Sequence, residues 1–196
     1  MKILFAIVSY LFGSFPTGYL IFRISEKKDI RDFGSKSMGA TNVLRLKGLK
    51  YALPVVPIDI LKGFLPVFLA LKLFPDKRFA LLCAFLAVLG HCFPVYIKFR
   101  GGKGVATTMG AFSILAFYPF LLSLATFLLI IIITRYVSLG SLLATMSLPL
   151  YIYLFKGDIE IIYLSFAVFL IIFIRHLGNI NRLIHGKEKK LGEKAK

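Results

Sequence analysis

The sequence is poor in cysteine, histidine and acidic residues, the side chains that most often hold metal ions. It has two cysteines, three histidines and nine aspartates and glutamates among 196 residues. Cys83 and Cys92 share one apolar segment, where a thiol usually acts as a small buried hydrophobic group. The spacing of a four-coordinate site is absent, so the composition predicts neither a disulfide nor a bound metal.

Apolar residues make up 58% of the chain, and the mean hydropathy is +0.82. Spanning a hydrocarbon layer of about 30 Å takes roughly 20 apolar residues in a helix, and several runs approach that length. The first run follows Lys2 as in a signal peptide, but no small-x-small cleavage site follows it, which favours an uncleaved span. The sequence predicts one all-α membrane domain over residues 1–196.

Apolar segments separated by polar loops predict seven transmembrane helices. They cover about residues 3–24, 51–73, 79–97, 104–117, 119–134, 138–155 and 159–177. The fourth and fifth segments form one long helix in an alternative interpretation, but that helix would extend about 46 Å, well beyond the hydrocarbon core. Pro119 favours a break between them.

The net charge of +16 has an uneven distribution over the predicted loops. Nucleic-acid binding is not predicted, because the basic residues are confined to interhelical loops instead of covering a soluble face. Most of the 25 lysines and arginines fall on one side of the membrane, and Lys62 falls inside the second span. The other side holds Lys2, Lys72, Lys77, Arg78 and Lys156. The positive-inside rule then places the amino terminus outside and the carboxyl terminus in the cytoplasm.

The first cytoplasmic loop, residues 34–45, reads GSKSMGATNVLR and leads into a helix-compatible stretch. Glycines let backbone amides converge on an anion, and Asn42 is suited to capping a helix whose free amides favour negative charge. Arg45, one turn further on, can pair with a phosphate bound there. We expect the hydroxyl donors to be Ser35, Ser37 and Thr41. A flexible polar loop with one solvated arginine is the alternative.

The second cytoplasmic loop, residues 98–107, reads KFRGGKGVAT. It differs from a Walker motif, because Lys103 is followed by Gly104 and no parallel sheet is available to hold the loop, so nucleotide hydrolysis is excluded. Lys103 and the amides of Gly101 and Gly102 precede a predicted helix, which suits a second phosphate. A positive-inside anchor in a tight turn is the alternative.

The third region, residues 175–188, places His176 and Asn179 three residues apart on one helix face. His176 can accept or share a proton near neutral pH, and Asn179 can hydrogen-bond an alcohol. A histidine that merely contacts lipid headgroups is the alternative. Smaller signals are Ser138 with Ser141, the interfacial His91, and Asp59 with Lys62. We expect the last two to pair, because unpaired charges are costly inside a membrane.

Together these motifs resemble the bacterial acyl-phosphate:glycerol-3-phosphate acyltransferase family. The resemblance covers nearly the whole chain and includes Gly13-Ser14, Pro16, Gly18, Gly34-Ser35, Gly39 to Asn42, Arg45, Asp59, Lys62-Gly63, Gly90-His91, Pro94, Gly101 to Thr107, Arg175-His176, Asn179-Ile180, Arg182-Leu183, Gly186 and Glu188. The sequence departs from the usual pattern at Lys36-Ser37 and Leu177-Gly178. The first departure adds a cation beside the expected anion site.

The resemblance implies an enzyme of the bacterial cytoplasmic (inner) membrane with its active site facing the cytoplasm. Its substrates would be acyl phosphate and glycerol 3-phosphate, and its product lysophosphatidic acid, acylated at the 1-position, for phospholipid synthesis. No cofactor, metal or obligate protein partner is expected. The implied substrate-binding residues are Ser35, Thr41, Asn42, Arg45, Gly101, Gly102 and Lys103, and the implied catalytic residues are Ser141, His176 and Asn179.

The sequence predicts direct attack of the substrate hydroxyl on the acyl phosphate, since no serine or cysteine is expected beside a base. The proton acceptor is His176 or a substrate phosphate. An anion transporter or channel is the alternative of another class, but beyond Asp59 and Lys62 the spans carry few charged groups that would line a path. A non-catalytic scaffold would leave the donor-rich loops without a purpose.

Overall fold

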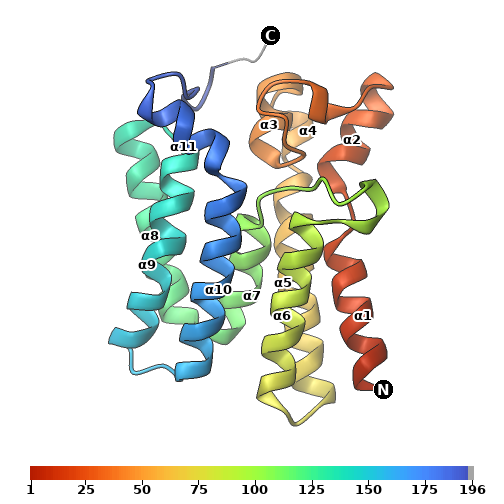
Figure 1. The fold of residues 1–196 in the computed structure, drawn as a ribbon, viewed down its shortest axis with the longest axis vertical. Coiled ribbons are helices and arrows are strands. Elements are labelled where there is room, and N and C mark those ends of the chain that lie inside the picture. Colours follow the sequence, from red (N-terminus) through yellow and green to blue (C-terminus); the bar gives the residue numbers. More distant parts are fainter. Residues whose placement is uncertain (194–196) are drawn as a thin grey trace.

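The computed structural model describes residues 1–193, which form a bundle of α-helices aligned roughly with one axis (Figure 1). No β-strand occurs in this part of the chain, and the prediction of an all-α protein is confirmed. Lys194 and Lys196, two cations of the predicted cytoplasmic tail, lie outside the described residues.

The amino-terminal half of the bundle contains six helices. They are α1 (Lys2–Gly13), α2 (Thr17–Glu26), α3 (Ala40–Lys47), α4 (Leu49–Ala52), α5 (Val55–Leu73) and α6 (Lys77–Cys92). The predicted first span is divided, since α1 and α2 meet at a 42° bend. The bend falls at Pro16, the residue preceding α2, because proline cannot continue the hydrogen-bond ladder of α1.

The carboxyl-terminal half contains the other five α-helices of the described chain. They are α7 (Val105–Leu115), α8 (Phe117–Thr134), α9 (Val137–Leu154), α10 (Ile159–Arg175) and α11 (Leu177–Ile184). Two 3-10 helices, Ile30–Asp32 and Val95–Ile97, lie in the loops. The break between α7 and α8 lies at Ala116, where the backbone leaves the helical region. Pro119 instead falls in the first turn of α8, where its missing N–H interrupts no helical hydrogen bond.

The helices differ in whether they are long enough to cross a membrane. Four helical segments are long and apolar enough alone: Leu49–Leu73, Lys77–Ile97, Phe117–Thr134 and Val137–Leu154. The bent pairs α1–α2 and α10–α11, the latter bent by 61°, raise the number to six, and α7 is shorter. The amino terminus and α11 lie at opposite ends of the bundle (Figure 1). The seven-span count and the orientation stay predictions.

Small residues bring the central helices into close contact. A Cβ atom at Gly63 of α5 would lie 1.8 Å from the carbonyl oxygen of Thr107, and one at Gly110 of α7 would lie 1.9 Å from that of Ile60. Gly13 of α1 approaches the Ala87 carbonyl of α6 in the same way, at 2.2 Å. Such contacts let helix backbones approach where the hydrophobic effect does not drive helices together. They hold α5 against α7 and α1 against α6.

The outer helices expose apolar side chains, as expected for contact with lipid. On α8, Leu129, Ile132 and Ile133 are 56%, 76% and 69% exposed. A continuous apolar surface of this kind is typical of a membrane-facing helix.

Candidate active site

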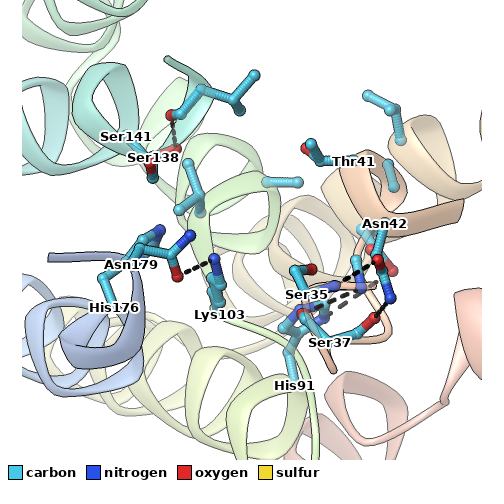
Figure 2. Close-up of a pocket in the computed structure, with 18 of the residues that line it drawn as sticks. Ser35, Ser37, Thr41, Asn42, His91, Lys103, Ser138, Ser141, His176 and Asn179 are labelled. Atoms are coloured by element: carbon cyan, nitrogen blue, oxygen red, sulfur yellow. Dashed lines mark hydrogen bonds and ion pairs between the residues drawn. The ribbon is translucent and has the colours of Figure 1, made fainter. Parts of the chain in front are cut away.

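A cavity of about 240 Å³ opens at the end of the bundle that carries α3 and α11 (Figure 1). This volume is far more than one water molecule needs. The cavity brings together eight of the predicted site residues: Ser35, Thr41, Asn42, Arg45, Lys103, Ser141, His176 and Asn179. Gly101 and Gly102 do not line it. Figure 2 shows Lys103 between two walls, one carrying Ser35, Ser37, Thr41 and Asn42 and the other Ser138, Ser141, His176 and Asn179.

Four helices begin at this cavity. Its lining includes Ala40 at the start of α3, Val105 at the start of α7, Val137 at the start of α9 and His176, which precedes α11. The first amides of a helix have no carbonyl partner within it, and the helix dipole places partial positive charge there. The starts of α3, α7 and α9 therefore contribute partial positive charge at the cavity, whereas α11 begins directly after the end of α10.

Asn42 organises the loop before α3. Its Oδ1 accepts from the Ser35 amide at 2.9 Å, and its Nδ2 donates to the carbonyl oxygens of Phe33 and Ser37 at 3.1 and 2.8 Å. The predicted capping role is wrong, because α3 begins at Ala40 with Gly39 as its cap. The side chain of Asn42, 1% exposed, is committed to the loop and holds Ser35 and Ser37 at the cavity wall.

Arg45 lies one turn further along α3 with an incompletely paired guanidinium. Its Nη2 donates to the Lys189 carbonyl oxygen at 2.6 Å. Its Nε is buried and has no hydrogen-bond partner within residues 1–193. Burial lowers the pKa of Arg45, and the nearby Glu188 opposes that shift. Because a buried unpaired donor is costly, Arg45 is prepared to bind an anion.

The glycines before Lys103 shape its loop. The Gly101 amide donates to the Cys92 carbonyl at 3.2 Å, and the Gly102 amide donates to the His91 carbonyl at 3.0 Å. Arg175 donates to both glycine carbonyls, at 2.7 Å to Gly101 and 3.0 Å to Gly102. The two amides predicted to bind phosphate are therefore engaged within the loop, and we leave Gly101 and Gly102 out of the proposed site.

Lys103 reaches the cavity and pairs with the opposite wall. Its Nζ donates to Asn179 Oδ1 at 2.6 Å (Figure 2). Burial lowers the pKa of Lys103 to about 7, although Glu188 favours the charged form. A bound anion would replace part of the lost hydration and restore the ammonium form.

His176 and Ser141 lie on the same wall as Asn179. His176 Nδ1 lies 2.8 Å from the Ile172 carbonyl oxygen, which can only accept, so Nδ1 carries the proton. Nε2 is left with a lone pair that can accept a proton. The Ser141 hydroxyl donates to the Val137 carbonyl at 2.8 Å, which leaves its oxygen available as an acceptor.

Two carboxylates outside the predicted site set also line the cavity. Asp59 Oδ1 lies 2.5 Å from Lys62 Nζ, which confirms the predicted pairing, and it accepts from Thr17 at 3.1 Å. Glu188 forms an ion pair with Arg182 at 2.7 Å. The three-residue spacing of Asp59 and Lys62 makes their pairing recognisable from the sequence. No local pattern reveals the pairing of Glu188 with Arg182, since the segment after α11 folds back over the cavity.

The cavity also has an apolar side. Val56 and Ile60 of α5, Met109 of α7 and Phe127 of α8 line it. Polar donors and apolar side chains thus share one site, as an amphipathic reactant requires. In the described chain no three histidine, cysteine, aspartate or glutamate side chains are grouped as metal ligands.

Comparison with known proteins identifies the family. A family model described as glycerol-3-phosphate acyltransferase matches residues 3–186. The chain belongs to this family. Among curated glycerol-3-phosphate acyltransferases, that of Endomicrobium trichonymphae is 44% identical, over 97% of this chain and 96% of the relative. That of Syntrophotalea carbinolica is 40% identical, over 94% of each chain.

Two crystal structures of the integral membrane glycerol 3-phosphate acyltransferase PlsY have the same fold. The glycerol 3-phosphate form has a TM-score of 0.93 at 37% identity and covers 97% of this chain and 96% of that one. The lysophosphatidic acid form has a TM-score of 0.89 at 36% identity, with coverage of 97% and 95%. The predicted family and membrane class are confirmed, and the chain is a glycerol-3-phosphate acyltransferase of phospholipid synthesis.

Proposed function

We propose that the protein transfers an acyl group from acyl phosphate to the 1-hydroxyl of glycerol 3-phosphate, giving lysophosphatidic acid and inorganic phosphate. The cavity would face the cytoplasm of a bacterial cytoplasmic (inner) membrane. The observation that carries the proposal is the presence of two cavity cations, the buried Arg45 and the half-buried Lys103, with no carboxylate directly paired to either within residues 1–193.

The charges around the cavity support two anionic groups in it. Asp59 is paired with Lys62, and Glu188 is paired with Arg182, so each carboxylate already has its own cation. Arg45 and Lys103 are left to neutralise bound ligands. Both substrates carry phosphate, and their mutual repulsion has to be offset before they can react.

The chemistry requires orientation more than activation, because an acyl phosphate is already a reactive mixed anhydride. The 1-hydroxyl oxygen attacks the acyl carbonyl carbon, a carbon–oxygen ester bond forms, and the bond from that carbon to the phosphate oxygen breaks. Inorganic phosphate leaves with the bonding electron pair. The hydroxyl proton passes to the departing phosphate or to His176 Nε2.

A direct transfer also fits the surroundings of the cavity serines. Ser138 donates to Glu188, and Ser141 donates to the Val137 carbonyl. Neither of these serines is hydrogen-bonded to a histidine in the described part of the chain, so the arrangement lacks the activated nucleophile of an acyl-enzyme mechanism.

The test is turnover by the purified protein in detergent. Acyl phosphate, an acyl thioester and a carboxylic acid are each supplied with glycerol 3-phosphate, and we expect lysophosphatidic acid from acyl phosphate alone. Equal product from the thioester would overturn the proposed donor. Product formation without a membrane-enclosed compartment would also exclude obligatory transport.

The residue assignment is tested by Arg45→Ala and Lys103→Ala, with Lys156→Ala as a matched loss of an exposed cation. We expect both cavity variants to lose turnover while remaining folded and the control to retain it. Wild-type turnover in both cavity variants would contradict the assignment.

A further inference from the structure

Glu188 is a buried carboxylate in the segment that follows α11. Its side chain accepts three hydrogen bonds: from Ser138 Oγ at 2.9 Å and Asn179 Nδ2 at 2.7 Å on Oε1, and from Arg182 Nε at 2.7 Å on Oε2. Glu188 is 6% exposed. These bonds join the chain after α11 to the start of α9 and to α11 itself.

We propose that Glu188 is a positioning residue for the reaction: by fixing the side-chain amide of Asn179, it directs the Asn179 oxygen to Lys103 and holds the ammonium group at the phosphate site. This inference rests on the proposed function, because it assumes that Lys103 binds a substrate phosphate.

The hydrogen-bond chemistry of the three residues permits only one arrangement. A carboxylate accepts but does not donate, so the NH₂ of Asn179 must face Glu188. The Asn179 oxygen is then turned to Lys103, whose Nζ lies 2.6 Å away. If the amide rotated by half a turn, its oxygen would face the Glu188 carboxylate and its NH₂ would face the ammonium group, and both contacts would be repulsive.

Glutamine cannot replace Glu188 in this arrangement. Its amide has a single acceptor oxygen for the three donors of Ser138, Asn179 and Arg182, and its NH₂ would compete with that of Asn179. Aspartate keeps the charge but is shorter by one methylene group. It can therefore restore the electrostatic effect without restoring all three hydrogen bonds.

The charges around Lys103 supply a second, independent link to Glu188. Lys103 faces Arg45 on α3, Arg175 on α10, Arg182 on α11 and the Glu188 carboxylate, and it also lies near His176. Burial lowers the pKa of Lys103 to about 7, the three arginines lower it further, and Glu188 alone among these groups raises it. Loss of the Glu188 charge therefore lowers the pKa of Lys103 further, so that Lys103 becomes neutral at a lower pH than in wild type.

An alternative role for Glu188 gives the opposite result. Its carboxylate occupies donors that a phosphate could use, and Arg45 contacts the next residue through the Lys189 carbonyl. If Glu188 competed with the substrate, removal of its charge would lower the KM for glycerol 3-phosphate.

The experiment compares Glu188→Gln with wild type in purified, folded form by the pH profile of kcat/KM for glycerol 3-phosphate. Glu160→Gln is the matched control, since Glu160 pairs with Arg78 on an exposed surface away from the cavity. The profile runs from about pH 6.5 to about pH 9, because a phosphate monoester loses its second proton near about pH 6. The fall of kcat/KM at high pH reports the pKa of a group that must be protonated in the free enzyme, which we expect to be Lys103.

We expect Glu188→Gln to raise the KM for glycerol 3-phosphate about tenfold, a change of about 1.4 kcal/mol. We also expect its falling limb to begin at lower pH than that of wild type. Glu188→Asp should return the falling limb toward the wild-type position. In a Lys103→Arg background, where the cation does not titrate, Glu188→Gln should leave the shape of the profile unchanged.

A lower KM in Glu188→Gln would overturn the inference and show competition with substrate. An unshifted falling limb would overturn it as well, while leaving the proposed function intact if Lys103→Ala is inactive. If Glu188→Gln does not fold, Asn179→Ala tests the same link. Its falling limb must also move to lower pH, because Lys103 then loses its acceptor.

Discussion

The two ends of the bundle use the same charged residue types in different surroundings. At the end without the cavity, Lys2 pairs with Asp76 at 2.6 Å and Arg78 pairs with Glu160 at 2.7 Å, and Lys2 and Arg78 side chains are 51% and 82% exposed. Exposed pairs of this kind contribute little to stability, because water and salt screen them.

In the cavity, Arg45 is buried and Lys103 is half-buried, and both contact neutral partners. Arg45 contacts a backbone carbonyl and Lys103 contacts an amide oxygen, whereas Lys62 forms a fully buried ion pair with the carboxylate of Asp59. Charges become available for ligand binding where burial removes water without supplying a full counter-charge. The surroundings of a cation, and not its residue type, therefore distinguish the candidate site from the opposite end of the bundle.

The largest effect is expected from Lys62→Ala. It leaves the buried Asp59 carboxylate without its cation, and breaking a buried pair costs about 3–5 kcal/mol. We expect the melting temperature of the purified protein to fall by about 10 °C. The double variant Asp59→Asn/Lys62→Met, which removes both charges, should recover most of that loss. An unchanged melting temperature in Lys62→Ala would show that water reaches Asp59.

The next effect is on catalysis. Lys103→Ala removes a positioned cation from the proposed phosphate site, and loss of one such donor typically lowers rate by about 10²–10³. We expect kcat/KM for glycerol 3-phosphate to fall by about that factor with little change in melting temperature. A loss below about threefold, in protein shown to be folded, would place the phosphate elsewhere.

A smaller effect is expected from pH. The pKa of Lys103 is lowered to about 7 by burial, so the unliganded protein loses this charge as pH rises through that value. Phosphate binding should weaken in the same direction, by up to about tenfold per pH unit. We expect kcat/KM to fall above about pH 7 in wild type and to stay level in Lys103→Arg. A level wild-type profile would contradict this assignment.

The smallest effect is expected at the opposite end. Arg78→Ala breaks an exposed pair with Glu160 and should change the unfolding free energy by less than about 1 kcal/mol. Its kcat/KM should equal that of wild type. A large loss of unfolding free energy or of kcat/KM in Arg78→Ala would show that the exposed pairs matter as much as the cavity cations do.

The sequence was sufficient to predict most of the helices, since long apolar runs leave few other structures in a membrane. Pro16 lies at the bend of the first span, because proline interrupts a helix wherever its N–H is needed. The break predicted from Pro119 is confirmed, but it lies at Ala116, and Pro119 itself occupies the first turn of α8 without interrupting it. A proline in a sequence does not reveal which of these positions it occupies.

The site was predicted by residue type but not by hydrogen-bond partner. Asn42 looked like a cap, yet its amide binds three backbone groups of its own loop. Gly101 and Gly102 looked like phosphate donors, yet Arg175 and the carbonyls of the last two residues of α6 hold them. Glu188 reaches the cavity only through the fold of the segment after α11. Such partners depend on tertiary contacts, which local spacing does not specify.

The convergence of the starts of α3, α7 and α9 on the cavity sets a lower limit to anion binding. These amides belong to the main chain, so among substitutions only those to proline remove them, and no ordinary change of pH discharges them. A double variant in which both Arg45 and Lys103 are replaced by alanine would still attract phosphate weakly. Lys103 and Arg45 then add titratable and replaceable charge to a main-chain contribution that depends on where the helices begin.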